Sequence, residues 1–214
     1  MAASTPPQFL RRYTDLPALL HLLRTRTITL LDPGSWDDRN DAAYLALYKE
    51  KKALTSLLAL CFAQVPETYH HWRVFAGGQA GVCIIFDRAR LLTTLKAVPG
   101  ITAARVKYAA LTAARTRTHP LRVRELPFLK RIGFKPEGEF RVIHESATAT
   151  HATLPIPLAL ECIRSISLSP WLHNSLKEAT VATLRSVEGC GKLHISRSTL
   201  ISNEQWKTFA QQAL

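Results

Sequence analysis

The sequence lacks most of the short motifs by which enzyme classes are recognised. It has no GxxxxGK[ST] loop, no GxGxxG after an apolar run, no HExxH and no GxSxG. These absences argue against a P-loop or Rossmann nucleotide site, a zinc-protease centre and a hydrolase nucleophile elbow. The adjacent pair His70 and His71 points to two different sides of the chain, so a polar turn explains it better than a metal site. We expect no metal ligands.

Cysteines and long apolar runs are also scarce. The four cysteines are widely spaced and form no CxxC pair, which argues against a disulfide framework or a zinc ribbon. Cys61 and Cys83 lie in apolar runs, where buried free thiols are ordinary. The first twelve residues lack the apolar core of a signal peptide, and no run reaches membrane-spanning length. We therefore expect a reducing, cytoplasmic setting without a membrane partner.

Acidic residues are few compared with basic ones. There are 28 Lys and Arg against 16 Asp and Glu, a net charge of +12, which favours a polyanionic partner such as nucleic acid. Between Arg105 and Lys135, nine basic residues face one acid, Glu125, so this segment alone carries +8. The nucleic-acid-binding residues predicted from this segment are Arg105, Lys107, Arg115, Arg117, Arg122, Arg124, Lys130 and Arg131.

The order of apolar patterns predicts a mixed α+β fold. The 214 residues, 47% of them apolar, suffice for one sizeable core, and neither a repeat nor a polar linker divides the chain. We expect one domain over residues 1–214. Strands are predicted at 9–14, 27–31, 55–63, 81–86, 106–109, around 139–144, at 162–170 and at 192–200; helices are predicted at 16–23, 42–52, 66–74 (a short helix or turn), 87–95 and 176–187.

The stretch from Phe134 to His144 turns from the basic segment into a strand. Glu139 and Arg141 alternate with apolar residues, so period 2 places them on one face of this strand. Gly138, between Glu137 and Glu139, could allow a substrate to approach the backbone closely. Two interpretations stay open at this point: an edge strand with a solvated Glu–Arg pair, or a catalytic carboxylate at Glu139.

Three other places have simple structural explanations. Arg12 and Thr14 fit a surface arginine and a helix-capping threonine around Tyr13. Trp72, followed by Phe75 and a glycine-containing loop, fits a core tryptophan beside a flexible connection. Asn40 and Asp41 fit the caps of the following helix.

Taken in order, however, these segments resemble a large uncharacterised bacterial domain family. Its members combine a Tyr/Arg-rich first strand, an Asn-Asp loop, a Cys-Phe strand, a W-x-x-Y-A…G-x-C-I-x-F centre and an E-x-E-[YF]-R strand. This chain departs from the pattern at Ala42, usually proline, and at Phe75, usually tyrosine. The matching segments are Leu10–Thr14, Asn40-Asp41, Cys61-Phe62, Trp72–Ala76, Gly81–Phe86 and Glu137–Arg141.

That family is in turn similar to the ADP-ribosyltransferase superfamily, which implies a fold of split, mixed or antiparallel sheets with flanking helices. The resemblance implies NAD as substrate, with Arg12 and Thr14 on its ribose or phosphate and Glu139 as the catalytic carboxylate. Arg141 joins the candidates because a guanidinium binds pyrophosphate bidentately. An aromatic side chain stacks on nicotinamide in these enzymes; the candidates here are Tyr13, Trp72 and Phe75, with Tyr69 as a further one.

The resemblance and the charge together predict an ADP-ribosyltransferase that modifies RNA or DNA. Analogy with such families suggests a toxin or anti-phage effector, with an antitoxin or regulatory protein as a further partner. Two alternatives remain: a non-catalytic nucleic-acid-binding module, and a nuclease that binds a metal ion through Glu137, Glu139 and Asp41.

Overall fold

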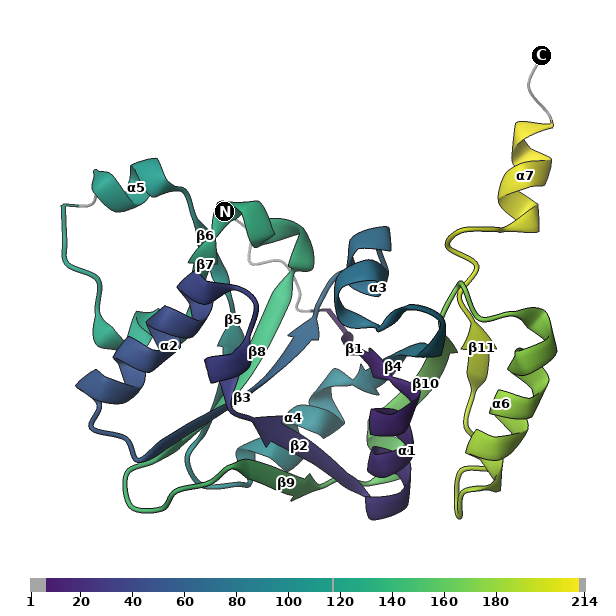
Figure 1. Ribbon diagram of the computed structural model, residues 1–214, viewed down its shortest axis with the longest axis horizontal. Helices are drawn as coiled ribbons and strands as arrows, with labels where there is room; N and C mark the ends of the chain where they lie inside the picture. Colours follow the sequence, from purple (N-terminus) through teal and green to yellow (C-terminus); the bar gives the residue numbers. More distant parts are fainter. Residues whose placement is uncertain (1–6, 117, 212–214) are drawn as a thin grey trace.

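The computed structural model describes residues 7–116 and 118–211. Within these ranges, nine strands form one sheet in the order β11-β10-β4-β1-β3-β2-β9, with β8 beside β3 and β5 beside β8 (Figure 1). Two short strands, β6 and β7, form a separate parallel pair. The strands are β1 (Phe9–Asp15), β2 (Thr27–Leu31), β3 (Ser56–Ala63), β4 (Gly81–Asp87), β5 (Ile101–Arg105), β6 (Lys107–Ala109), β7 (Leu129–Arg131), β8 (Glu139–Ser146), β9 (Thr153–Pro157), β10 (Ile163–Leu168) and β11 (Ile195–Arg197).

The sheet forks at β3. One edge of β3 pairs with β8 along all eight residues, from Ser56 opposite Ser146 to Ala63 opposite Glu139. The other edge touches β1 only where Arg11 faces Ala63, and touches β2 only where Leu31 faces Ala59. Beyond its contact with β3, β1 pairs along its full length with β4. The two arms, β1-β4-β10-β11 and β3-β8-β5, therefore diverge from a narrow junction (Figure 1).

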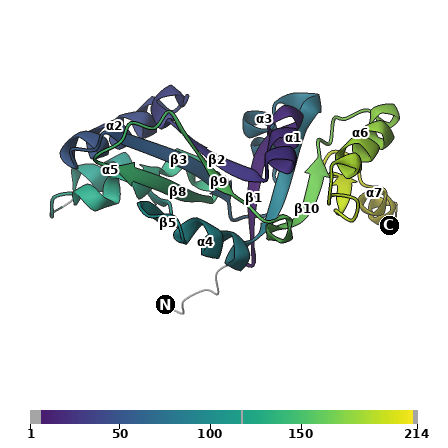
Figure 2. The same ribbon diagram turned by 90° about the horizontal axis from the view of Figure 1, so that it is seen from below.

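Helices cover both faces of the β3-β8-β5 arm, with α2 on one side and α4 on the other (Figure 2). Alternation along β3 explains this: Leu58 and Leu60 belong to the cluster that includes α1 and α4, whereas Leu57 belongs to the cluster with α2. The helices are α1 (Leu16–Thr25), α2 (Arg39–Lys51), α3 (Tyr69–Phe75), α4 (Arg88–Lys96), α5 (Leu111–Arg115), α6 (Asn174–Ser186) and α7 (Glu204–Ala210), with short 3-10 helices η1 (Pro33–Ser35), η2 (Gly78–Ala80), η3 (Val123–Phe128), η4 (Ile132–Glu137) and η5 (Leu160–Cys162).

The expected α+β class with a mixed, split sheet is confirmed. Its strands pair antiparallel except β10 and β11, which run parallel. Both ends of the chain contribute to the sheet, because β1 begins at Phe9 and β11 ends at Arg197. None of the helices in the described ranges is long and apolar enough to cross a lipid bilayer.

Two local predictions were wrong in ways that matter for the site. Asp41 does not cap α2; Asp38 does, with its carboxylate accepting from the backbone N–H groups of Asn40 and Asp41. Asp41 therefore lies in the first turn, and its side chain is buried. The strand that carries Glu139 is not an edge strand, because β8 lies between β3 and β5.

The remaining differences concern short or irregular strands. β5, β7 and β9 were not expected. β9 includes two prolines, β5 carries only one large apolar residue, Ile101, and β7 lies in the basic segment. The predicted final strand from 192 to 200 shortens to Ile195–Arg197. α7 lies beyond every predicted element, at the C-terminal end of the described chain.

Candidate active site

A cleft of about 460 Å³ opens where β1 and β3 diverge. Arg11, Arg12 and Tyr13 line it from β1, residues 59–63 from β3, and Glu139 from the start of β8. This volume is in the usual range for small-molecule sites. The fork of the sheet thus brings the first-strand arginine and the late-strand glutamate of the predicted site, which are far apart in sequence, into one cavity.

The predicted pair of Glu139 and Arg141 is a buried ion pair. The Arg141 guanidinium donates from Nε to Glu139 at 2.7 Å and from both terminal nitrogens to Asp41 at 2.8 and 2.6 Å. It also donates to the Pro127 carbonyl at 2.8 Å, and it lies over the Trp36 ring at 5.0 Å. The side chain is fully buried and does not line the cleft. The prediction that Arg141 binds the cofactor was therefore wrong, since its donors are already used to orient Glu139.

Lys130 is the second cation of this cluster. Its Nζ lies 2.7 Å from Glu137, 3.4 Å from Glu139 and 3.5 Å from Asp41, and its side chain is 9% exposed. The prediction that Lys130 contacts nucleic acid was therefore wrong, because its ammonium forms ion pairs with three carboxylates. The Lys130 ammonium lies between the three carboxylates, where a metal ion would have to bind if the protein were the nuclease of the alternative hypothesis. No group of His, Cys, Asp and Glu in the described chain is arranged to hold a metal ion.

The two glutamates of the cluster have opposite pKa shifts. Burial acts to raise the pKa of Glu139, but the charges of Arg141 and Lys130 outweigh burial, so its pKa lies below the usual 4.5. For Glu137 burial prevails over the contact with Lys130, and its pKa is raised. Glu139 is consequently an ionised carboxylate at neutral pH, and it is nearly buried in the wall of the cleft.

Arg12 lines the same cleft. Among the described residues its guanidinium forms neither a hydrogen bond nor an ion pair, and the groups that act on its charge are Cys61 and Asp15. Burial lowers its pKa, and its charge is only weakly offset by nearby groups. Arginine keeps its charge in proteins, so this side chain is suited to bind an anion that enters the cleft. Thr14, the predicted companion of Arg12, does not line the cleft.

The aromatic residues predicted to stack on nicotinamide differ in their position relative to the cleft. Trp72 is fully buried and its indole N–H donates to Glu67 at 2.8 Å, so the prediction that it stacks on the cofactor was wrong: it is a core residue. Tyr13 and Phe75 line the cleft, with Tyr13 9% and Phe75 40% exposed. Tyr69 lies outside the cleft lining, where its hydroxyl accepts a hydrogen bond from Arg73.

His71 is a site residue that the sequence did not reveal. Its ring stacks on Tyr13 with 5.0 Å between centroids, and its two nitrogens contact the Thr68 hydroxyl at 2.7 Å and the Glu137 carbonyl at 2.9 Å. Burial lowers its pKa, which keeps the ring neutral at pH 7. His71 thereby fixes α3 against the segment that carries both glutamates. A buried histidine in a short helix gave no signal in the sequence pattern.

Most of the predicted nucleic-acid-binding residues lie at the surface. Arg117 lies outside the described residues, and Lys130 is in the buried cluster. The segment is anchored by Leu126, which packs with Leu45 and Tyr48 of α2. The exposed members are Arg105, Lys107, Arg115, Arg122, Arg124 and Arg131.

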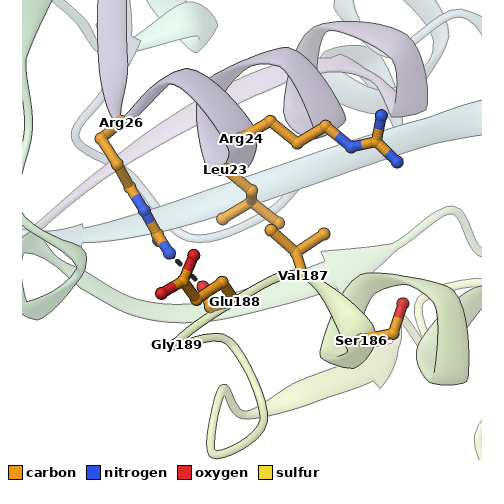
Figure 3. A pocket seen from close by; sticks show the side chains of 7 residues that line it. All are labelled: Leu23, Arg24, Arg26, Ser186, Val187, Glu188 and Gly189. Carbon is orange, nitrogen blue, oxygen red and sulfur yellow. Dashed lines mark hydrogen bonds between the residues drawn. The ribbon is translucent and has the colours of Figure 1, made fainter.

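A second hollow, of about 640 Å³, lies between the end of α1 and the segment that follows α6 (Figure 3). Its Arg26 guanidinium donates to the Glu188 carbonyl, as the dashed line in Figure 3 shows. None of the residues predicted to act in catalysis or binding lines this hollow. The cleft at the fork of the sheet, rather than this hollow, is therefore the candidate active site.

Comparison with known proteins gave structural similarity only. Neither protein-family models nor curated proteins match the chain. Among solved structures, the chain is similar to DarT of Thermus sp. 2.9 in complex with ADP-ribosylated ssDNA, with 12% identity, a TM-score of 0.48, and 92% of this chain and 98% of that chain covered. The same protein in complex with NAD+ has 11% identity, a TM-score of 0.46 and coverage of 92% and 98%. With carba-NAD+ the values are 10%, 0.46, and 91% and 97%.

At this distance the likeness concerns the course of the chain alone and assigns no role to any residue.

Proposed function

We propose that this chain is an NAD-dependent ADP-ribosyltransferase that modifies nucleic acid. The observation that carries the proposal is the pairing, in one cleft, of an ionised and rigidly held Glu139 with the unpartnered guanidinium of Arg12. A carboxylate and a cation in the same cleft are suited to a substrate that develops positive charge at one point and carries phosphate at another.

The chemistry of NAD meets this description. When the bond from the ribose C1′ to the nicotinamide nitrogen breaks, the electron pair leaves with nicotinamide, and the ribose acquires oxocarbenium character. The Glu139 carboxylate stabilises that positive charge. Arg141 and Lys130 keep this carboxylate ionised and hold its orientation. An oxygen or nitrogen of the acceptor then forms the new bond to C1′ and gives up its proton.

The other cleft residues fit the remaining parts of NAD. Arg12 supplies a guanidinium for the pyrophosphate, for which the arginine fork is well shaped. Phe75 offers the more exposed ring for stacking on nicotinamide, whereas Tyr13 is nearly buried and stacks on His71. The exposed basic residues from Arg105 to Arg131 support nucleic acid as the acceptor.

Isotope-labelled NAD tests this proposal. The purified protein is incubated with labelled NAD and separate pools of RNA, single-stranded DNA, duplex DNA and protein. We expect label on a nucleic-acid pool, and a loss of roughly a hundredfold or more in Glu139→Gln. The matched control is Glu145→Gln on the same strand, whose carboxylate binds Tyr48 and Lys52 rather than the cleft. Equal labelling by Glu139→Gln would remove the assigned role.

The exposed basic segment also favours a second candidate function, a nucleic-acid-binding module without catalysis. This alternative predicts salt-dependent binding with no nicotinamide release in the presence of any acceptor pool. Label transferred by the wild type would exclude it.

A further inference from the structure

A pair of arginines meets at the end of the sheet where the Glu139 strand begins. Gln64, the residue after β3, accepts at its side-chain oxygen from Arg105 Nε at 2.9 Å and from Arg88 at 3.3 Å. The amide nitrogen of the same side chain donates to the Glu139 carbonyl at 3.2 Å. The backbone N–H of Gln64 binds the Gly138 carbonyl at 2.9 Å. Gln64 therefore fixes two guanidinium groups relative to the strand of the catalytic candidate.

Arg88 is held in place by more than this amide. Its guanidinium lies over the Phe140 ring, 4.4 Å from the centroid, which is a cation–π contact. Its backbone N–H binds the Gln8 carbonyl at 3.0 Å, at the start of α4. Arg105 is opposite Phe140 in the pairing of β5 with β8, and its side chain is exposed. The pair thus combines one anchored cation with one that faces solvent.

The charge of this pair is not balanced. In the described chain, neither Arg88 nor Arg105 forms an ion pair with a carboxylate, and the neutral oxygen of Gln64 is their shared acceptor. Asp87, the acid next to Arg88, caps α4 by accepting from the Arg90 N–H at 2.9 Å. Burial and the repulsion from Arg105 lower the pKa of Arg88. An anion bound between the two guanidinium groups would relieve this repulsion.

We propose that Arg88 and Arg105, oriented by Gln64, bind a backbone phosphate of a single-stranded nucleic acid acceptor. Guanidinium forks match phosphate oxygens in geometry as well as in charge. Arg105 also begins the series of exposed basic residues that runs to Arg131, so a strand bound here has further contacts along that segment. A single strand fits because a base inside a duplex cannot reach into a cleft. The choice of acceptor rests on the proposed function.

The test measures binding without NAD, by fluorescence anisotropy of labelled single-stranded DNA and RNA oligonucleotides. For the double variant Arg88→Ala/Arg105→Ala we expect affinity to fall about tenfold or more. The slope of log affinity against log salt should become shallower by about 0.7, the value for one phosphate that is no longer neutralised on a single strand. Arg105→Ala alone, at an exposed position, should give about half of that change in slope. The control that loses the same charge as Arg105→Ala is Arg185→Ala on α6, which should leave both quantities unchanged.

The outcomes separate this inference from the proposed function. Wild-type affinity and slope in both Arg105→Ala and the double variant would overturn the inference, whatever happens to transfer. Equal loss in the Arg185→Ala control would also overturn it, because net charge alone would then explain the binding. Specific loss of oligonucleotide binding would support the inference even if no labelled NAD were ever transferred. Loss of NAD binding instead of oligonucleotide binding would reassign the pair to the cofactor and overturn it as well.

Discussion

Replacing Arg141 by methionine tests the ion cluster beneath the cleft. The change keeps a side chain of similar length but leaves Glu139 and Asp41 buried without the cation that donates to both. Breaking a buried ion pair from one side costs about 3–5 kcal/mol of unfolding free energy. For a chain of this size each kcal/mol shifts Tm by roughly 2–4 °C, so we expect Tm to fall by roughly 6–20 °C.

The pH dependence of the same variant has a defined sign. In the wild type the folded-state pKa of Glu139 lies below 4.5, so its stabilising contribution is present above that pH and is lost as pH falls through the lowered pKa. Between pH 5 and pH 8 Glu139 therefore does not make the free energy of unfolding of the wild type depend on pH. Without Arg141, burial raises the Glu139 pKa, although Lys130 at 3.4 Å offsets part of the rise. Stability of the variant should therefore fall as pH rises from 5 to 8.

Urea unfolding at pH 5 and pH 8 measures both effects. The control is Arg185→Met, an exposed position on α6 where we expect a change within about 0.5 kcal/mol. Comparing variant with wild type at each pH removes the contribution of Glu137, which both proteins share. A loss below about 1 kcal/mol, with the same difference at both pH values, would show that Arg141 does not hold Glu139 as a buried ion.

Three further predictions concern the cleft. Arg12→Ala should raise KM for NAD about tenfold or more while leaving Tm nearly unchanged, because the guanidinium has no partner among the described residues; steady-state kinetics that show an unaltered KM would contradict this. Phe75→Ala should lower transfer with little effect on stability, whereas Trp72→Ala should lower stability by about 3–5 kcal/mol; a thermal-melt series that ranks the two the other way would refute the assignment. Lys130→Met should lower both stability and transfer, while Arg131→Met, its exposed neighbour, should leave Tm unchanged; equal melts for the two would place Lys130 at the surface.

The sequence pattern was sufficient for most of the regular elements. The apolar run predicted as a strand at 55–63 agrees with β3 within one residue, and the helix predicted at 87–95 agrees with α4 within one residue. The cap of α1 is Asp15 rather than Thr14. Alternation in β8 correctly placed Glu139 and Arg141 on one face, where they form an ion pair.

The long-range contacts had no local signal. Asp41 and Arg141 are 100 residues apart, and a buried acid near a helix start has the same sequence appearance as a cap. Lys130 stands in a basic run whose other described members are exposed, so nothing in the sequence distinguishes the one lysine that turns inward. The Gln64 contact with two arginines depends on three chain segments that meet only when the sheet forms.

The central claim is that Glu139 drives cleavage of NAD in the cleft, and nicotinamide release tests it most directly. Release from NAD should be measured for the wild type, Glu139→Gln and Glu145→Gln at neutral pH with single-stranded nucleic acid present. We predict that the wild type and Glu145→Gln release nicotinamide at similar rates and that Glu139→Gln is slower by roughly a hundredfold or more. Release by Glu139→Gln at the wild-type rate, or none from the folded wild type with any acceptor, would contradict the account.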